Sequence, residues 1–315
     1  MHTLLINMLL NEKFIYCWLC DASQNTGEGK LGNIFVNQQF KIKGKIYTIE
    51  NIYPKYKKFY NTLNYKYISP FVGIIFCWFF YIKRQRVCYV NYLPLWNFFI
   101  FLLLPPQTIL GPITGGAIFK KNNFRKFIFP YFYKISEFFL NIRSNEIIFS
   151  TNLLKIFLNN KTISKSKFGF IKNIYLKKKI LYNKINYKKN IDFLIYFKKH
   201  KNKQLFFPIN FIKRLISLGF KIHIIGDYLN LKGVINHKFL SNKKVENMLS
   251  MTRFTIASGE NIDSLFILEA ITKKVMVIVP NDYFKKVDNF KDKFLFLNFN
   301  KIHNLKELIF LKNSF

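Results

Sequence analysis

Short apolar runs alternate along the chain with longer helix-like runs and turn residues. In the first half, strands are predicted over residues 13–20, 45–50, 86–92, 108–113 and 146–151, and helices over 31–40, 71–82, 94–104 and 124–142. Apolar strands separated by helices are typical of a parallel sheet covered on both faces. Ser69 and Pro70 predict the start of the helix over 71–82, because they suit the N-cap and the first helical position. The first half is therefore predicted to be an α/β domain.

The same alternation returns after a polar, basic and weakly periodic stretch over 159–190. Here strands are predicted over 192–197, 221–226, 234–239, 254–258 and 275–280, and helices over 208–219, 242–250 and 264–273. We interpret the basic stretch as the crossing between two domains, 1–185 and 186–315. Two doubly wound, Rossmann-like α/β domains of this kind hold a ligand in a crevice between them, at the carboxyl ends of their strands.

The composition is strongly basic and aromatic. Lys and Arg number 50 against 16 Asp and Glu, a formal net charge of +34, and 38 residues are Phe. Such a charge favours a polyanionic partner such as phosphate, nucleic acid or an anionic membrane surface. The enriched residue types are all encoded by A/T-rich codons, however, and no aromatic RNA-binding motif is visible. We therefore expect no nucleic-acid partner.

Four cysteines occur, and Cys17 and Cys20 form a C-x-x-C inside an apolar run. A zinc site needs a second ligand pair at matching spacing, which Cys77 and Cys88 do not supply. We therefore predict buried free thiols in a reducing cytoplasm, and neither a metal nor another cofactor. The N-terminus lacks a basic leader and a cleavage site, and the apolar runs are too short to span a membrane, so we expect a cytoplasmic protein.

The segment FTIASGENIDSLFILEAITKKVMVIVP (254–280) holds the residues best suited to ligand chemistry. A strand ends at Ser258, a glycine permits a tight bend, and Glu260 follows at the strand's carboxyl end. Glu260 and Glu269 can accept hydrogen bonds from hydroxyls of a sugar and a ribose. By itself the pattern is equally typical of an ordinary strand–helix–strand unit with solvated acids.

The start of the helix inside this segment is a second candidate for ligand binding. Asp263 or Ser264 can cap the helix, which places Leu265 in its first turn. Backbone amides of a first turn point out of the helix and bind phosphate or sugar oxygens.

The segment resembles the sugar-nucleotide motif of the retaining GT-B glycosyltransferases called group 1, or family 4. Their pattern is a strand ending in Ser, a Glu-Gly-Phe-Gly loop, a Leu-Glu-Ala helix, a Gly-x-Pro and an apolar strand. The matching positions are Ala257, Ser258, Glu260, Leu268, Glu269, Ala270 and residues 275–280. Asn261–Ser264 replaces the Gly-Phe-Gly, and Lys274–Met276 replaces the Gly-x-Pro. The resemblance implies a GT-B fold, with two Rossmann-like domains facing each other across a crevice.

In this family the first Glu contacts the transferred sugar and the second contacts the ribose of the nucleotide. That implies a catalytic Glu260 and a donor-binding Glu269. The family places seven residues between its two Glu, whereas eight intervene here, so Glu260 or Asn261 fills the first position. The implied donor-binding set is Glu269, Lys198, Lys203, Gly226, Ser258, Asn261, Ser264 and Leu265.

Two upstream segments follow the same family order. GFKIHIIGD (219–227) resembles the strand that ends in a Gly, here Gly226, next to the base or ribose. In the loop after the strand over 192–197 the family has an Arg and a Lys that bind the diphosphate. Their counterparts are Lys198 and Lys203, with Lys199 and Lys201 as alternatives. Cations there neutralise the leaving diphosphate without a metal, although a solvated loop is the other interpretation.

In the first half, NTGEGKLG (25–32) and GPITGG (111–116) resemble glycine-rich loops of the same family. Their glycines let the backbone approach a diphosphate or an acceptor closely, and the candidates are Gly27, Gly29, Gly115 and Gly116. Many family members also use a first-domain His near the reacting sugar, but His2 is the only His in the first domain here. In the second domain, His223 is expected to be a core or edge histidine.

The resemblance implies metal-independent transfer of a hexose, with retention, from a nucleotide-diphosphate sugar to a glycan or lipid-linked acceptor in cell-surface polysaccharide synthesis. The alternative is a degenerate, non-catalytic GT-B protein or a basic protein bound to a membrane surface. The basic, aromatic helices over 71–104 favour docking at the inner face of the cell membrane, but they equally fit a soluble surface of biased composition. After residue 280 only a short tail follows, so we expect a trimmed second domain.

Overall fold

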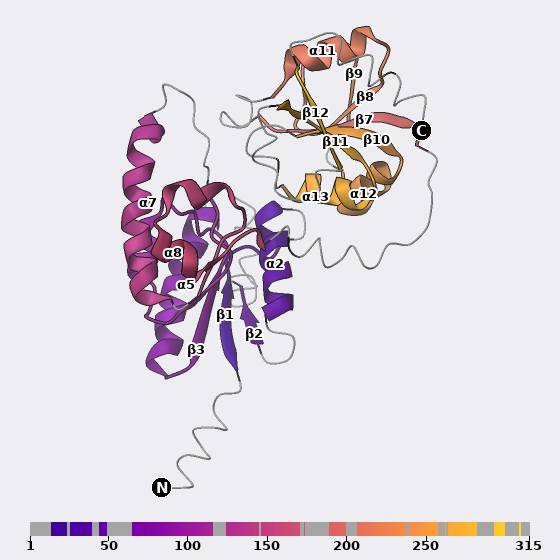
Figure 1. Ribbon diagram of the computed structural model, residues 1–315. Coiled ribbons are helices and arrows are strands. Elements are labelled where there is room, and N and C mark those ends of the chain that lie inside the picture. The colour runs from indigo at the N-terminus through magenta and orange to yellow at the C-terminus, as the bar shows by residue number, and fades with distance from the viewer. Residues whose placement is uncertain are drawn as a thin grey trace, which may run out of the picture. The chain divides into compact units, whose positions relative to one another are not determined.

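The protein contains two α/β units. The computed structural model describes residues 14–23, 26–39, 44–48, 65–115, 124–144, 146–170, 173, 189–199, 207–237, 240–257, 262, 264–281, 293–299 and 309. The chain divides into Met1–Ile171 and Lys172–Phe315, whose elements Figure 1 labels. The domain boundary predicted between 185 and 186 lies outside the described residues and stays a prediction.

The first unit is built on a parallel sheet. Its strands are β1 (Ile15–Leu19), β2 (Gly44–Tyr47), β3 (Arg86–Val90) and β4 (Ile109–Leu110), in the order β2-β1-β3-β4. Cys17 of β1 lies opposite Cys88 of β3. An isolated bridge between Ile113 and Phe149, and the parallel pair β5 (Ile147–Ile148) and β6 (Ser166–Lys167), continue the strand pairing beyond β4.

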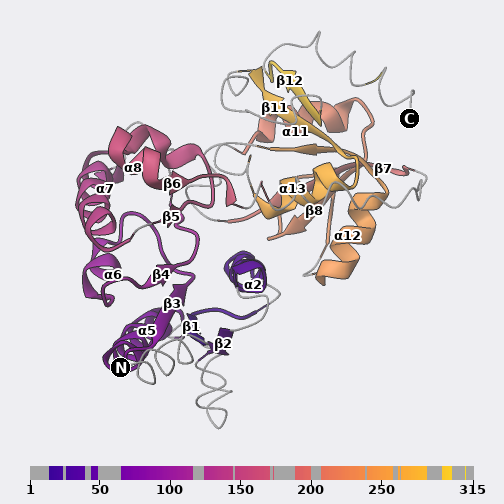
Figure 2. The same cartoon turned by 60° about the horizontal axis from the view of Figure 1, so that its bottom comes forward.

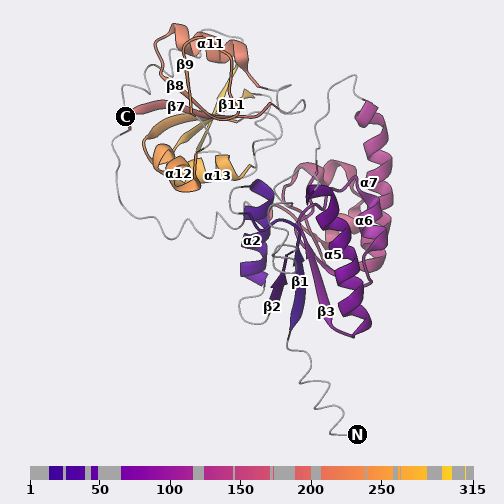
Figure 3. The same ribbon diagram turned by 180° about the vertical axis from the view of Figure 1, so that it is seen from behind.

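Helices cover both faces of this sheet. They are α2 (Gly27–Gln39), α5 (Tyr65–Ile82), α6 (Phe98–Leu103), α7 (Phe124–Arg143) and α8 (Asn160–Lys165), with a 3-10 helix over Leu153–Phe157. Because side chains alternate along a strand, Cys17 and Leu19 of β1 pack with α2, whereas Trp18 and Cys20 join the core under α5, α6 and α7. Figures 2 and 3 show α2 on one side of the sheet and α5 and α7 on the other.

This alternation separates the two thiols of the C-x-x-C. Cys17 and Cys20 lie in different cores, on opposite faces of the sheet. All four cysteines are free and buried. Burial raises the pKa of the Cys20 thiol to about 12, so it is neutral at physiological pH. Among the residues that the structure describes, no group of three or more His, Cys, Asp or Glu side chains is placed to hold a metal ion.

Helix α5 begins earlier than the sequence predicts. Ser69 and Pro70 lie inside α5, so the prediction that Ser69 caps this helix is wrong. The Ser69 hydroxyl instead donates to the carbonyl oxygen of Cys20 (2.9 Å), and the Ser69 carbonyl accepts from the Trp18 indole N–H (3.1 Å). The two bonds link α5 to Trp18 of β1 and to Cys20, which directly follows this strand. A tertiary role of the hydroxyl thus replaces the local capping role.

The basic stretch after residue 159 is also partly misassigned from sequence. Its first part folds as α8 and β6 within the first unit, rather than as a crossing between domains. The Asn159 side chain caps α8 by accepting from the backbone N–H of Thr162 (2.7 Å). The buried Glu137 carboxylate of α7 accepts from the Asn159 N–H (2.7 Å). These contacts fold a segment whose composition looks like a linker.

The second unit contains one six-stranded parallel sheet, in the order β12-β11-β10-β7-β8-β9. The strands are β7 (Ile191–Phe197), β8 (Ile222–Gly226), β9 (Val234–Asn236), β10 (Thr252–Ile256), β11 (Met276–Pro280) and β12 (Phe294–Leu297). Numbered along the chain of this unit, the order is 3-2-1-4-5-6, that of the Rossmann fold. Strand β12 was not predicted.

Helices also cover both faces of the second sheet. Helix α11 (Ile209–Ser217) packs on one face, whereas α12 (Asn242–Ser250) and α13 (Leu265–Thr272) pack on the other. Figure 1 shows the same division. Ser241 precedes α12 as predicted, but its side chain makes no capping hydrogen bond. Across the described parts of both units, no helix combines the length and apolar character needed to cross a bilayer.

Candidate functional site

The order of the strands in the second unit defines where a ligand would bind. From β7 the chain continues to β8 and β9 on one side of the sheet, whereas β10 leads to β11 and β12 on the other. Strands β7 and β10 are neighbours, with Phe193 opposite Phe254. Ligands of doubly wound folds bind at this reversal, beyond the carboxyl ends of the strands. Lys198 follows β7 there, and Ala257 leads from β10 into the loop before α13.

Gly226 at the end of β8 lies in close contact with the end of β7. Its φ is +96°, and a Cβ added to it would lie 2.3 Å from the carbonyl oxygen of Phe197. The backbone N–H of Asp227 donates to that same oxygen (2.9 Å). The Asp227 carboxylate in turn accepts from the backbone N–H of Lys199 (2.6 Å). The backbone on either side of Lys198 is therefore held, while the Lys198 side chain is exposed.

Helix α13 begins beside the same edge of the sheet. Tyr196 of β7 packs against Phe266 in the first turn of α13, with ring centroids 5.8 Å apart and the ring planes tilted by 35°. Burial and the nearby Asp227 carboxylate raise the pKa of Tyr196, so it stays protonated. The Ser264 hydroxyl caps the helix by accepting from the N–H of Ile267 (3.4 Å). Ser264 as cap and Leu265 as first helical residue are thus placed as the sequence predicts.

Glu269 lies one turn further along α13 and is half-buried. Its neighbours Leu268 and Ala270 belong to the buried side of the helix. Glu269 therefore sits at the border between the core and the solvent-facing side. A carboxylate at such a border can accept hydrogen bonds from a ligand hydroxyl while its stem stays fixed by packing.

Several predicted site residues lie outside the described residues and stay predictions. In the second unit these are Ser258, Glu260, Asn261 and Lys203, together with the alternative Lys201; in the first unit, Gly116. The predicted site residues that the structure does describe in the second unit gather on two elements, the end of the β7–β8 pair and α13.

The first unit has an analogous polar cluster after β1. The buried Asp21 carboxylate accepts from the N–H of Ser23 (2.8 Å), the hydroxyl of Thr26 (2.7 Å) and the hydroxyl of Tyr92 (3.3 Å). Strands β1 and β3 are adjacent, and their carboxyl ends supply Asp21 and Tyr92. Burial and the neighbouring Asp21 carboxylate raise the pKa of the Tyr92 phenol, which donates to Asp21.

Asn91 is the most constrained residue of this cluster. It has φ +74° and the adjacent Tyr92 has φ +50°, a conformation that L-residues seldom adopt. The Asn91 amide donates to the Asp21 carbonyl (2.7 Å), but its buried side-chain oxygen has no hydrogen-bond partner. Strained backbone and unpartnered buried polar atoms concentrate at functional sites.

The structure corrects the predicted loop over 25–32. Gly27 and Gly29 form the first turn of α2 instead. A Cβ on Gly29 would lie 2.0 Å from the Ser23 carbonyl oxygen, whereas Gly27 has nothing within 4 Å of such an atom. The Gly29 N–H donates to the Thr26 hydroxyl (2.9 Å). Gly29 is therefore required by the turn itself, and α2 begins eight residues after the end of β1 at Leu19.

Gly115 follows the bridged segment after β4 and is half-buried. Its φ of +152° lies at the limit of the region that favours glycine. A Cβ there would meet the Leu154 side chain at 3.5 Å, which is ordinary contact. The predicted need for glycine at this position therefore comes from backbone conformation rather than from a close neighbour.

Sequence reasoning missed Asp21, Asn91 and Tyr92. A signal was present for Asp21, since it is an acidic residue directly after the strongly apolar strand 13–20. Asn91 and Tyr92 were included in the predicted strand 86–92. Their left-handed backbone ends that strand at Val90, and only the pairing of β1 with β3 brings them to Asp21.

Comparison with known proteins identifies the fold. No family model and no curated protein matches the sequence. A crystal structure described as a UDP-N-acetylglucosamine 2-epimerase from Listeria monocytogenes has a TM-score of 0.51 at 10% identity, covering 96% of this chain and 88% of that one. Methanocaldococcus jannaschii UDP-GlcNAc 2-epimerase has a TM-score of 0.47 at 10% identity, covering 95% of this chain and 92% of that one. E. coli heptosyltransferase WaaC with ADP has a TM-score of 0.39 at 8% identity, covering 94% of this chain and 98% of that one.

The predicted fold class is confirmed. The protein has the α/β architecture of the GT-B fold, with two Rossmann-like units built on parallel sheets. The crevice expected between the units stays a prediction, as does membership of the retaining group 1 family.

Proposed function

We propose that the protein is a metal-independent glycosyltransferase that moves a hexose from a nucleotide-diphosphate sugar to a glycan or lipid-linked acceptor, with retention. The observation that carries this proposal is the carboxyl edge of the second sheet. There the exposed Lys198 follows β7, and the neighbouring strand β10 leads to α13, which carries the Ser264 cap and the half-buried Glu269. The motif over 254–280 and the GT-B fold support the same assignment.

Each group has a physical role in this proposal. The Lys198 ammonium and the first-turn amides of α13 stabilise the diphosphate as it leaves. Glu269 accepts hydrogen bonds from the ribose hydroxyls, and Glu260 or Asn261 contacts the hexose. In the reaction the bond from the anomeric carbon to the diphosphate oxygen breaks, a bond to the acceptor oxygen forms, and the acceptor proton passes to the released nucleotide diphosphate. Transfer of this kind supports cell-surface polysaccharide synthesis at the cytoplasmic side of the membrane.

Replacement of Glu269 tests donor binding directly. We expect Glu269→Gln to weaken binding of the preferred nucleotide-diphosphate sugar, measured by calorimetry over a panel of donors, by roughly 10- to 100-fold, because a hydrogen bond to a charged group contributes about 1.5–3 kcal/mol. Glu246→Gln is the matched control, since Glu246 is an exposed Glu of α12 in the same unit. Equal affinities for the two variants, or no binding of any donor by the wild type, would contradict the proposal.

A second candidate is epimerisation of the same class of nucleotide sugar, the activity named for the Listeria protein that shares the fold. The two reactions differ in products: transfer releases a nucleotide diphosphate and lengthens an acceptor, whereas epimerisation returns an intact nucleotide sugar of changed configuration. Chromatography of a reaction with and without glycan acceptors separates them. Tight donor binding with neither product supports the non-catalytic alternative.

A further inference from the structure

The outward side of three helices in the first unit is unusually apolar. Seventeen of the twenty-five exposed large hydrophobic side chains among the described residues lie on or beside α5, α6 and α7, and we call this surface the α5–α7 face. They are Tyr67, Ile68, Phe71, Ile75, Trp78, Phe79, Ile82, Trp96, Phe99, Leu102, Leu103, Phe124, Phe127, Tyr131, Ile135, Phe138 and Ile142. Contiguous apolar surface of this extent marks an interaction site on a soluble domain.

The spacing of these residues shows that the face is continuous. On α7 the exposed apolar positions run from Phe124 to Ile142 at intervals of three and four residues, which forms one stripe along a helix. Tyr133 and Leu140 lie on the opposite, buried side. Helix α7 therefore has two apolar sides, and the core uses only one of them.

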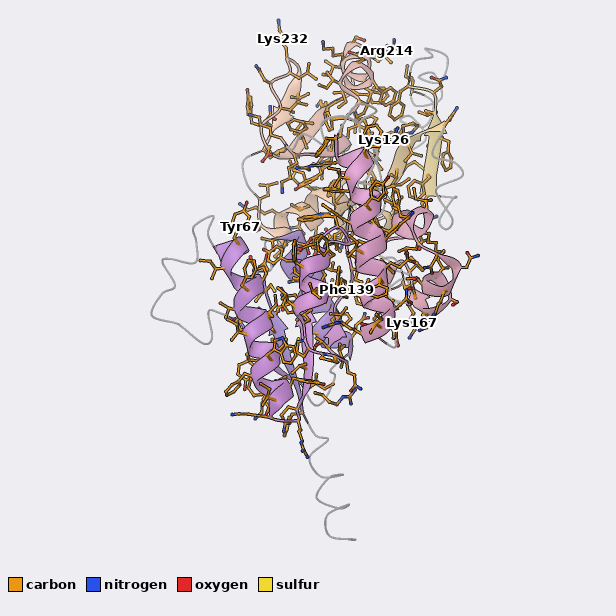
Figure 4. All side chains as sticks on the ribbon, turned by 90° about the vertical axis from the view of Figure 1, so that its left-hand side faces the viewer. Tyr67, Lys126, Phe139, Lys167, Arg214 and Lys232 are labelled. Atoms are coloured by element: carbon orange, nitrogen blue, oxygen red, sulfur yellow. The ribbon has the colours of Figure 1, made fainter. Side chains whose placement is uncertain are left out.

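The three helices are held side by side. The Trp78 indole N–H of α5 donates to the carbonyl oxygen of Leu103 in α6 (2.7 Å). Helix α6 packs against α7, where the rings of Phe98 and Phe132 lie 5.4 Å apart. Figure 4 looks onto this face, with Tyr67 at one end of α5 and Lys126 near one end of α7.

The exposed charges between residues 65 and 144, a range that includes the whole α5–α7 face, have one sign. Between residues 65 and 144 the sequence contains a single acidic residue, Glu137, whose carboxylate is buried and accepts from a backbone N–H. Exposed cations border the apolar side chains: the Lys83 ammonium lies 3.9 Å from the ring centroid of Phe79, and Arg125 and Lys126 flank the start of the α7 stripe.

A basic cleft adjoins one end of the face. It has a volume of about 890 Å³ and is lined by Arg84, Arg86 and Arg143, with Glu146 as an acidic lining residue. Ile82 belongs both to the cleft and to the apolar face. The cleft lies where β3 and β4 begin, at the edge of the sheet opposite Asp21. It is therefore separate from the carboxyl-edge cluster.

We propose that the α5–α7 face docks on a bilayer of anionic phospholipids, with its aromatic side chains among the upper acyl chains and its cations, including the exposed Arg84 and Arg86 of the cleft, on the headgroup phosphates. Amphipathic surfaces that combine aromatic side chains with flanking Lys and Arg bind in this way, and they bind more strongly to anionic lipid. A second copy of the chain is a poorer occupant, because two such faces would oppose cations with cations. The inference does not depend on the proposed glycosyltransferase activity, since docking is measured without a sugar nucleotide.

Vesicle sedimentation of the full chain tests the apolar part of the proposal. We expect the protein to bind vesicles of mixed phosphatidylglycerol and phosphatidylcholine. We expect the double variant Phe71→Gln/Phe127→Gln to bind them at least about tenfold more weakly, because two apolar side chains no longer leave water. These side chains are 62% and 64% exposed, so the fold does not rely on them. Tyr228→Gln in the second unit, where Tyr228 is 62% exposed, is the matched control and should bind like the wild type.

A second double variant tests the role of the cations in vesicle binding. Arg84→Gln/Arg86→Gln should lower binding to the anionic vesicles about tenfold or more. The control Lys213→Gln/Lys243→Gln, at exposed cations of the second unit, should have little effect. Added salt should weaken wild-type binding, since exposed charges are screened. Equally strong binding to pure phosphatidylcholine would overturn the role assigned to the cations.

Two further results would overturn docking itself. One is vesicle binding by Phe71→Gln/Phe127→Gln that equals the wild type, with circular dichroism showing both proteins folded. The other is a wild-type dimer in gel filtration that this variant dissociates, without vesicle binding by either protein. In that case the face is an interface between two copies of the chain.

Discussion

Gly226 offers the sharpest test of the geometry at the carboxyl edge of the second sheet, because the chain provides a matched control. Gly226 and Gly219 both have positive φ, +96° and +77°. A Cβ at Gly226 would lie 2.3 Å from the Phe197 carbonyl oxygen, but at Gly219 it would meet nothing within 4 Å. The two Gly→Ala substitutions therefore share backbone strain and differ in the close contact.

The expected magnitudes follow from these contacts. Gly219→Ala should cost about 1–2 kcal/mol, the strain of a left-handed L-residue. Gly226→Ala adds overpacking, about 1–3 kcal/mol, because the Phe197 oxygen is paired backbone and cannot move without weakening its bond from Asp227. We therefore expect Gly226→Ala to lower the free energy of unfolding by roughly 2 kcal/mol more than Gly219→Ala.

The assay should report on each unit separately. All three tryptophans, Trp18, Trp78 and Trp96, lie in the first unit, so tryptophan fluorescence during urea denaturation follows that unit. Hydrogen exchange of peptides from β7 and β8 follows the second unit and should show the loss in Gly226→Ala. Equal protection in the two variants would refute the close approach of Gly226 to Phe197.

Two further predictions concern charged groups. Asp192→Ala should lower the free energy of unfolding, measured by urea denaturation, by about 3–5 kcal/mol, because it removes the carboxylate 2.7 Å from the largely buried Arg253. Glu146→Ala, at the exposed Glu146–Lys167 pair, should change it by less than about 1 kcal/mol. Equal losses in the two variants would contradict this prediction. Burial and a neighbouring imidazole lower the pKa of His223, so the unfolded chain binds this proton more readily than the folded one. The free energy of unfolding should therefore fall as the pH drops from 6.5 toward the lowered pKa of His223 in the folded protein. In thermal melts, His223→Gln should lose less stability than the wild type over this pH range. The same pH profile for both proteins would contradict the prediction.

Strands and helices with a strong local pattern were predictable, and they are confirmed. The apolar runs that became β1, β3, β7 and β11, and the amphipathic run of α12, lie where the sequence places them. Local pattern was sufficient there, because short continuous apolar runs bounded by turn residues are typical of buried parallel strands, whereas a period of about 3.6 residues is typical of a helix.

Errors arose where distant contacts decide the local structure. Strand β12 is a strand because it pairs with β11, with Val277 opposite Phe294, and the tail around it carries no alternation to reveal this. Helix α8 forms within a basic stretch because the Asn159 side chain caps it and the Glu137 carboxylate of α7 accepts from the Asn159 N–H. Ser69 has the identity of a cap but bonds to Cys20 instead.

The candidate site shows the same division. The cap at Ser264 and the position of Glu269 on α13 were predictable, since they depend on neighbours within a few residues. Asp21 gained significance only when β3 placed Asn91 and Tyr92 beside it. The close approach of Gly226 to Phe197 likewise requires the pairing of β8 with β7.

The sequence by itself determined most of the order of elements, and with it two α/β units, because the hydrophobic pattern acts within each element. The tertiary structure alone decided the order of strands in each sheet, and hence that the ends of β7 and β10 are neighbours. It also decided which side of α5 and α7 faces solvent. Both helices are apolar on two sides, so periodicity cannot say which side the core will bury; only packing on the sheet leaves the α5–α7 face outside.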